Sequence, residues 1–152
     1  YPCSFKYPAV LSYNSPLGSV NTYDPNNWQA LGIEYDEQIY KRAVENKETA
    51  ISGNRTDFVL CSAENYKVPA DVDRCYFFNP FSIEIFQSVL TRIYESYYEN
   101  PREILLFFYY PSEDYVSSLM LQEQLMFYDE IDTSDLFPGE DKREKILIFQ
   151  VS

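Results

Sequence analysis

Gly32-Ile33-Glu34-Tyr35-Asp36 is the stretch that decides the fold, because an apolar run ends there in acids just where a helical pattern begins. Trp28 to Leu31 give it a short apolar lead-in. Within residues 37–46, apolar side chains recur on one helical face, at Ile39, Tyr40, Ala43 and Val44. The pattern predicts a strand followed by a helix. In open α/β sheets ligands bind beyond the carboxyl ends of the strands, where the carboxylate of Glu34 could accept hydrogen bonds from both hydroxyls of a ribose.

The size and composition of the chain indicate one globular domain. Its 152 residues suffice to bury a core, and 45% of them are hydrophobic and 18% aromatic. The 24 acids outnumber the 12 bases, which gives a formal net charge of −12. A surface this negative repels phosphate backbones, so direct nucleic-acid binding is not expected. No apolar stretch reaches 18 residues, so no membrane span is expected either.

The cysteines are Cys3, Cys61 and Cys75, which are widely spaced and form no CxxC pair. The last two lie in apolar, strand-like runs, where a free thiol behaves as a small buried hydrophobe. The sequence therefore predicts no disulfide, no metal site and a cytoplasmic location. Its first residues lack a basic segment followed by an apolar one, so no secretory signal is expected.

Residues 1–27 are rich in proline, asparagine and serine and are expected to be an irregular N-terminal segment. Within them only Tyr7 to Tyr13 could hold a short helix or strand. Residues 28–152 are expected to form the α/β domain.

Regular elements follow one another in the second part. Apolar runs predict strands at residues 57–63, 74–79 and 103–110, and helical patterns cover residues 83–98 and 112–121. Two last strands, at 125–132 and 145–151, flank the turn residues 137–141, which indicates an antiparallel hairpin. The order predicts a three-layer α/β sandwich with a mostly parallel sheet and one antiparallel strand.

This order resembles the class I methyltransferase fold, which is Rossmann-like and whose sheet ends in such a hairpin. The residues narrow the resemblance to small bacterial methyltransferases that use S-adenosylmethionine. The Asn79-Pro80-Phe81 sequence after an aromatic strand, paired with GIEYD, is its most specific part. The matching segments, which cover about four-fifths of the chain, are GIEYDEQIYKRAVEN (32–46), DFVLCSAENYKVPADVDRCYFFNPFS (57–82), ENPREILLFFYYPSEDY (99–115) and REKILIFQV (143–151).

The resemblance implies S-adenosylmethionine as the cofactor and gives individual residues a role. Glu34 would accept hydrogen bonds from the ribose hydroxyls, Tyr35 would lie near the adenine, and Glu64 would lie near the adenine amino group. Asn79, Pro80 and Phe81 would line the mouth at which the methyl group is transferred.

The methyl acceptor, a small molecule or a protein, is not identified by the sequence. In related N-methyltransferases an Asn/Asp-Pro-Pro-aromatic segment orients an amine. The second proline is missing here, so an amine is only suggested. Methyl transfer is an in-line displacement that depends on positioning, so the lack of histidine is compatible with it.

The first strand and the glycine-rich loop of the family are missing. They should precede GIEYD, but the only glycine between Val10 and Gly32 is Gly18. About 25 residues are absent relative to the family, including a central strand, whose loss would expose sheet edges that favour oligomers. Three explanations stay open: a decayed relative, a chain that lacks a segment between Val20 and Trp28, or an N-terminal segment that folds as a substitute. In the first two, S-adenosylmethionine should bind poorly or not at all.

The same residues also have plain structural interpretations. Glu34 could be a solvated strand-end acid, Glu64 part of a surface turn, and Asn79-Pro80 a strand stop. The aromatic rows are expected to pack the core, at residues 76–78, 94–98 and 107–110.

Two functions therefore stand side by side. The first is a methyltransferase, which could be incomplete or inactive as written. The second is a non-catalytic interaction protein on a degenerate methyltransferase scaffold. A third, imitation of nucleic acid, rests on charge alone. An open, ligand-sized pocket beside Glu34, Glu64 and Asn79 would favour the first function. A pocket that the N-terminal segment fills would favour the second.

Overall fold

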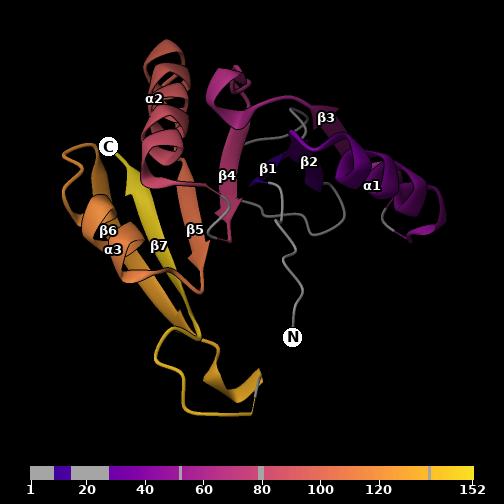
Figure 1. Ribbon diagram of the computed structural model, residues 1–152. Helices are drawn as coiled ribbons and strands as arrows, with labels where there is room; N and C mark the ends of the chain where they lie inside the picture. Colours follow the sequence, from indigo (N-terminus) through magenta and orange to yellow (C-terminus); the bar gives the residue numbers. More distant parts are fainter. Residues whose placement is uncertain (1–8, 15–27, 52, 79–80, 137) are drawn as a thin grey trace.

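Seven strands form one mixed sheet in the computed structural model, which describes residues 9–14, 28–51, 53–78, 81–136 and 138–152 (Figure 1). The strands lie in the order β3-β2-β1-β4-β5-β7-β6. Their bounds are β1 Ala9–Asn14, β2 Trp28–Glu34, β3 Thr56–Leu60, β4 Val72–Phe77, β5 Leu105–Tyr109, β6 Leu125–Asp132 and β7 Lys145–Val151.

The strand directions confirm an α/β sheet that ends in an antiparallel hairpin. β2 pairs parallel with β3, and β4 pairs parallel with β5. β7 runs antiparallel to both of its neighbours, β5 and β6. The two strands of the hairpin have the predicted bounds.

β1 fills the central position of the sheet, between β2 and β4, but runs antiparallel to both. The expectation that a central strand is missing is therefore wrong, because part of residues 1–27 supplies one. This favours the third explanation, a substitute built from the N-terminal segment. With β1 and β7 both reversed, the sheet is also less parallel than predicted. Residues 15–27, which contain most of the segment from Val20 to Trp28, lie outside the described residues.

The central place of β1 also changes the argument for oligomers. Because β1 pairs on both sides, the edges of the described sheet are β3 and β6, at its two ends. The expected cause of self-association, edges exposed by a lost central strand, is thus wrong. An oligomer stays a prediction.

Each of the three described α-helices begins after a residue whose side chain caps it. A carboxylate oxygen of Asp36 accepts hydrogen bonds from the N–H groups of Gln38 (2.9 Å) and Ile39 (3.1 Å) at the start of α1, Glu37–Thr49. Ser82 and Ser112 cap the other two helices, α2 (Ile83–Glu99) and α3 (Glu113–Met120). Both helices were predicted from their patterns. Three short 3-10 helices complete the described elements: η1 Gly53–Arg55, η2 Ala63–Asn65 and η3 Ser134–Leu136.

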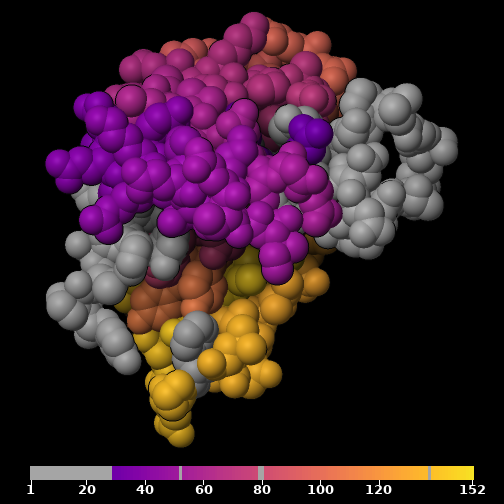
Figure 2. Space-filling view, turned by 90° about the vertical axis from the view of Figure 1, so that its right-hand side faces the viewer, coloured from indigo at the N-terminus to yellow at the C-terminus, as the bar shows by residue number. Residues whose placement is uncertain are grey.

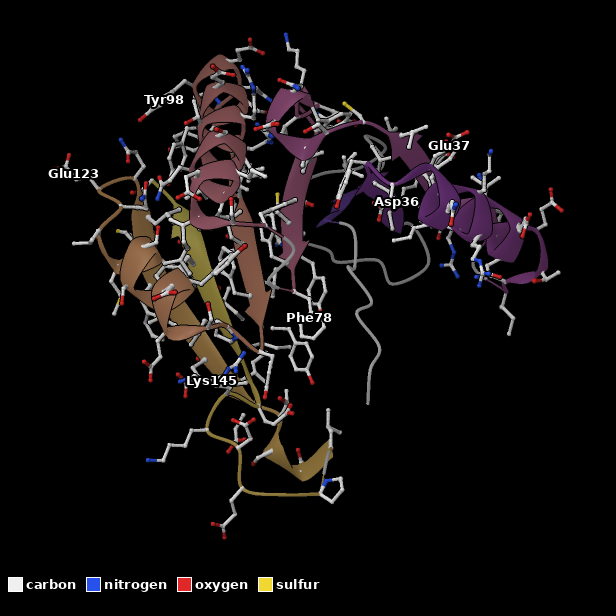
Figure 3. All side chains as sticks on the ribbon, viewed as in Figure 1. Asp36, Glu37, Phe78, Tyr98, Glu123 and Lys145 are labelled. Carbon is white, nitrogen blue, oxygen red and sulfur yellow. The ribbon has the colours of Figure 1, made fainter. Side chains whose placement is uncertain are left out.

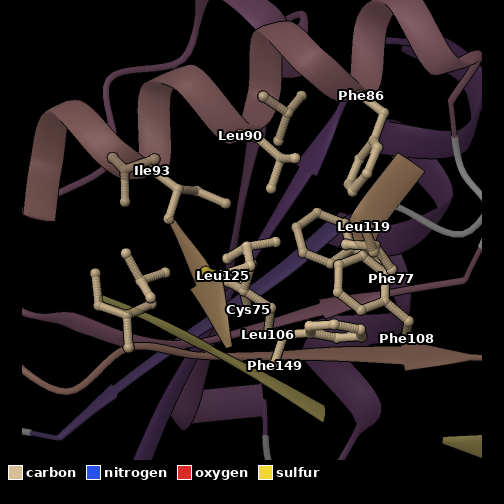
Figure 4. Packing of buried hydrophobic residues seen from close by; sticks show 14 of the residues in the cluster. Cys75, Phe77, Phe86, Leu90, Ile93, Leu106, Phe108, Leu119, Leu125 and Phe149 are labelled. Atoms are coloured by element: carbon tan, nitrogen blue, oxygen red, sulfur yellow. The ribbon is translucent and has the colours of Figure 1, made fainter. Parts of the chain in front are cut away.

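The core lies between the sheet and helices α2 and α3 (Figure 4). The rings of Phe77 and Phe108 stack with 5.0 Å between their centroids, and Phe86 of α2 meets both edge-on. Cys75 is a free, fully buried thiol in the same cluster, as its apolar surroundings predicted. Burial raises its pKa to about 12, so it stays protonated at neutral pH.

α1 forms the other helical layer. Its contacts with the sheet are to β3 and β2, and none of its side chains is buried. Right-handed crossovers that extend a sheet in opposite directions place their helices on opposite faces, so α1 and α2 lie on different sides. Among the described α-helices, α1 is the one that covers this face of the sheet. Among the described residues, the predicted three layers are therefore all found near β2 and β3.

Arg102 joins the start of β4 to the end of α2. Its guanidinium donates to the backbone oxygens of Val72 (2.7 Å), Asn100 (2.9 Å), Ser96 (3.0 Å) and Pro69 (3.1 Å). It also donates to the hydroxyl of Ser96, which is buried and donates in turn to Pro69. The Ser96 carbonyl also accepts a hydrogen bond of 3.1 Å from the N–H of Asn100, so Arg102 adds a second donor to it and supplies one to the carbonyl of Asn100 at the end of the helix.

Candidate functional site

The carboxyl ends of the parallel strands meet at one edge of the sheet, where ligands bind in folds of this kind. Glu34 ends β2, Phe77 ends β4 and Tyr109 ends β5. β1, in contrast, enters the sheet at this edge, since Ala9 lies opposite Ile33 near the end of β2.

Glu34 is the buried acid of this edge, with 3% of its surface exposed. One carboxylate oxygen accepts a hydrogen bond of 2.8 Å from the N–H of Asp36, and its carbonyl accepts one of 2.9 Å from the N–H of Cys61. These contacts fix the carboxylate at the turn between β2 and α1, where Figure 3 labels Asp36 and Glu37. With one oxygen held by the backbone, a ribose would be bound by the other. A solvated strand-end acid does not describe Glu34.

The two residues predicted near the adenine are more open. Tyr35 is 58% exposed, next to Glu34. Glu64 lies in η2, beyond β3, where one of its carboxylate oxygens accepts a hydrogen bond of 3.2 Å from the hydroxyl of Ser62. Its carbonyl accepts one of 3.0 Å from Arg92 of α2. The described contacts therefore hold Glu64 to α2 and include no hydrogen bond that links it to Glu34.

Of the predicted transfer mouth, Phe81 is described, whereas Asn79 and Pro80 lie outside the described residues. The backbone of Phe81 is held by Tyr115 of α3. The N–H of Phe81 donates to the Tyr115 hydroxyl (3.0 Å), which donates to the carbonyl of Phe81 (2.6 Å). Tyr115 is 5% exposed. This contact could not be found from the sequence, because Tyr115 and Phe81 are 34 positions apart.

Aromatic rings gather beside this segment, at the ends of β4 and β5. Phe78 stacks on Tyr109 with 5.2 Å between centroids and lies 6.3 Å from the ring of Tyr110. Phe78 directly precedes Asn79, and Figure 3 labels it at the end of β4. The sequence predicted that these rows pack the core. Phe77 and Phe108 do so, but these three side chains are only half-buried, at the edge of the sheet.

The loop between β6 and β7 is held by hydrogen bonds to Tyr109 and Tyr110. The hydroxyl of Tyr109 donates to Glu144 (2.9 Å), and that of Tyr110 donates to Asp141. The guanidinium of Arg143 lies 4.1 Å from the centroid of the Tyr110 ring, within cation–π range. Tyr110 has a φ of 50°, a conformation that bulky residues rarely adopt outside functional or tightly constrained sites.

Four of the cavities lined by described residues lie elsewhere, since Glu34, Tyr35, Glu64 and Phe81 line none of these four. One of about 260 Å³ lies between α2 and the segment after η2. Another, of about 500 Å³, lies in the loop between β6 and β7. The pocket expected beside Glu34, Glu64 and Asn79 involves a residue outside the described part, so it stays a prediction.

Two further features, a metal site and a membrane span, concern the described residues. These residues contain no group of three or more His, Cys, Asp and Glu side chains that could hold a metal ion. None of their helices has the length and apolar character needed to cross a membrane. The cytoplasmic location stays a prediction.

Comparison with known proteins identifies the fold. No family model and no curated protein matches the chain. The N-methyltransferase NodS from Bradyrhizobium japonicum is similar in structure over 80% of this chain and 71% of its own, with a TM-score of 0.54 and 9% identity. A protein from Haemophilus influenzae, provisionally named a methylase, is similar over 80% of this chain, with a TM-score of 0.50 and 14% identity. The fold is methyltransferase-like. At this identity the likeness concerns the fold alone, and the chain spans 65% of the length of the Haemophilus protein.

S-adenosylmethionine, the cofactor that the resemblance implies, consists of a nucleoside half and a methionine half. A buried acid at the end of β2 suits the ribose of the nucleoside half. The methionine half would need the backbone of a loop after the first strand, but β1 is reversed, so its carboxyl end, Asn14, lies at the opposite edge. The described glycines lie elsewhere, in β2, in η1 and in the loop between β6 and β7 (Gly32, Gly53 and Gly139). Among the described residues, Glu34 is thus a candidate partner for the nucleoside half, and no glycine-rich loop for the methionine half is found.

The buried Tyr115 and the half-buried Tyr109 predict a loss of stability in alkali. Burial raises the pKa of Tyr115 to about 12, and burial together with the hydrogen bond to Glu144 raises that of Tyr109 to about 12. Because the folded protein favours the neutral phenols, their contribution is complete below pH 10 and is lost as the pH rises through 10 to 12. For Tyr115 the rise from 10.0 to about 12 corresponds to about 3 kcal/mol.

Urea unfolding followed at pH 8, 10 and 11.5 would measure this effect. The Tyr115→Phe variant is the control, because it lacks the phenol and should lose less stability between pH 10 and 11.5. Equal losses in both proteins would contradict the assignment to Tyr115.

Proposed function

We propose that this chain is an S-adenosylmethionine-dependent methyltransferase in which Glu34 binds the ribose of the cofactor. The observation that carries the proposal is the buried carboxylate of Glu34 at the carboxyl end of β2, in a sheet that resembles those of methyltransferases. Tyr35 and Glu64 are proposed to adjoin the adenine. The described residues provide for the nucleoside half alone, so the proposal reaches as far as nucleoside binding. Transfer would further require a cradle for the methionine half.

For the methyl acceptor we propose an amine, bound beside Asn79, Pro80 and Phe81. Two observations support this choice: the Asn-Pro-aromatic order of the segment, and the likeness of the fold to an enzyme named as an N-methyltransferase. Tyr115 would hold the segment in place through the backbone of Phe81. The half-buried rings of Phe78 and Tyr109 would limit the access of water to the acceptor.

Calorimetric titration with adenosine, S-adenosylhomocysteine and S-adenosylmethionine tests the proposal. Because the nucleoside half carries the binding, the three dissociation constants should agree within about fivefold. Glu34→Gln should weaken all three by about tenfold, since an amide cannot accept from the Asp36 N–H and two ribose hydroxyls as a carboxylate does. Glu37→Gln, which neutralises an exposed acid in the next turn, is the matched control and should leave them unchanged.

Two outcomes would contradict parts of the proposal. If S-adenosylmethionine binds more than about a hundredfold tighter than adenosine, the chain does supply a cradle for the methionine half. If none of the three ligands binds, the methyltransferase proposal fails. The second candidate, a non-catalytic interaction protein, would then remain, and it is favoured by the exposed apolar side chains at residues 120–136.

A further inference from the structure

The outermost strand β6 presents an apolar edge. Among the described strands it pairs with β7 alone and is the last in the sheet. Four of its side chains are 44–55% exposed, namely Met126, Phe127, Tyr128 and Ile131. Of the eleven large hydrophobic side chains exposed in the described chain, seven lie between Met120 and Leu136. An edge strand with this much exposed apolar surface is a template for pairing with another chain.

The strand consists of two halves with different chemistry. Its register with β7 shifts between Phe127 and Asp129, so a bulge divides it. The first half, 125–128, is apolar, and the second, 129–132, carries three carboxylates and no base. In the second half the N–H of Glu130 donates to the carboxylate of Asp129 at 2.8 Å, so this backbone donor is occupied. Backbone pairing is therefore expected mainly along the apolar half, and charge recognition along the other.

The acidic half leads into the cavity of about 500 Å³ in the loop between β6 and β7. Its lining contains two lysines, Lys142 and Lys145, and six acids: Glu130, Asp132, Asp135, Glu140, Asp141 and Glu144. Hydrogen bonds from Ser134 lower the pKa of Asp132, and one from Tyr110 lowers that of Asp141, so both are ionised at neutral pH. The cavity is large enough for a basic side chain and has the complementary charge.

The charge also excludes one occupant of the edge, a second copy of this chain. Antiparallel pairing of two β6 strands would bring six carboxylates into one seam, between two chains that each carry a net charge of −12. In full antiparallel pairing the acidic half of each β6 would also lie opposite the apolar half of the other, so neither half would meet a complementary surface. The partner that complements both halves is basic.

We propose that β6 binds an extended basic segment of another protein, which adds a strand to the apolar half and inserts lysine or arginine side chains into the acidic cavity. The apolar half comes first in β6. A segment that pairs antiparallel therefore has its basic residues first and its alternating apolar residues after them. Main-chain hydrogen bonds would supply affinity, and the apolar side chains and the cavity would supply specificity, as in other cases of strand addition. The inference does not depend on Glu34 or on a cofactor.

Fluorescence anisotropy with a labelled peptide, Lys-Arg-Lys-Thr-Val-Thr-Val-Tyr, tests the surface on the full chain. The double variant Asp135→Asn, Glu140→Gln should weaken binding about tenfold, and Met126→Thr about fivefold. The matched control neutralises two exposed acids of α1, Glu37→Gln with Glu45→Gln, and should bind as the parent does. A peptide with glutamate in place of its three basic residues should not bind.

Hydrogen exchange identifies the mode of binding. With the peptide bound, amide exchange should slow within residues 125–132 and remain unchanged in α1. Protection elsewhere, or equal affinity of the parent and the double variant, would overturn the proposal. A dimer of the protein alone with a protected β6 would show that a second copy is the occupant, which also overturns it. Tighter binding of the reversed peptide would overturn the antiparallel direction.

Discussion

Replacing Arg102 by methionine is expected to lower the free energy of unfolding by about 3–5 kcal/mol. Methionine keeps much of the apolar stem but leaves the carbonyls of Val72, Ser96 and Pro69 without the guanidinium that binds them. Val72 is fully buried and Ser96 nearly so, so water cannot easily replace the lost donors. Since typical domains are stable by about 5–15 kcal/mol, the variant should lie close to unfolding.

Urea unfolding followed by far-ultraviolet circular dichroism would measure this loss. Arg42→Met on the exposed side of α1 makes the same chemical change and should alter stability by less than about 0.5 kcal/mol. Arg102→Lys should fall between the two, because an ammonium cannot reproduce the planar fork. Equal midpoints for Arg102→Met and Arg42→Met would show that the cluster contributes nothing.

Tyr115→Phe is expected to lower the free energy of unfolding by about 2 kcal/mol at pH 7. The change removes one oxygen atom that accepts from the N–H of Phe81 and donates to its carbonyl. Both backbone groups then lose their partner while the Phe86 ring, 4.8 Å from the Tyr115 ring, keeps its contact. The effect therefore reports the hydrogen bonds rather than the packing.

Tyr98→Phe provides the matched control, because Tyr98 is 64% exposed at the other end of α2. Its loss of stability should stay below about 0.5 kcal/mol. If the two variants unfold at the same urea concentration, the Tyr115 hydroxyl does not hold the segment after β4.

The stretch that predicted the fold does so because each of its residues has a separate role. Gly32 leaves room for the Phe58 ring, since a Cβ would lie 2.6 Å from it. Ile33 packs in the core, and the carboxylate of Glu34 accepts a hydrogen bond from the backbone N–H of Asp36. Tyr35 is exposed, and the side chain of Asp36 caps α1. Such local signals, strand pattern and helix cap together, are what sequence analysis reads well. The same holds for the serine-capped α2 and for the hairpin.

The reversal of β1 could not be read from the sequence, because a run of six residues carries no sign of the direction in which it pairs. The contacts of Arg102 with Val72 and Pro69 and that of Tyr115 with Phe81 were missed for a related reason, since they join residues 30 or more positions apart. Of the candidate site, the position of Glu34 at the strand end was predicted correctly. The burial of the Glu34 side chain was not predicted, because it depends on how the neighbouring turn folds.

Within the described sheet, β1 is the strand that joins β2 and β3 on one side to β4, β5, β7 and β6 on the other. Detachment of these six residues would divide the sheet into pieces of two and four strands, and each piece would gain an unpaired edge strand. The β1 strand of a neighbouring molecule could take the same position between β2 and β4, with the same register. Refolding at high protein concentration is therefore expected to yield domain-swapped dimers, which should dissociate only slowly after dilution.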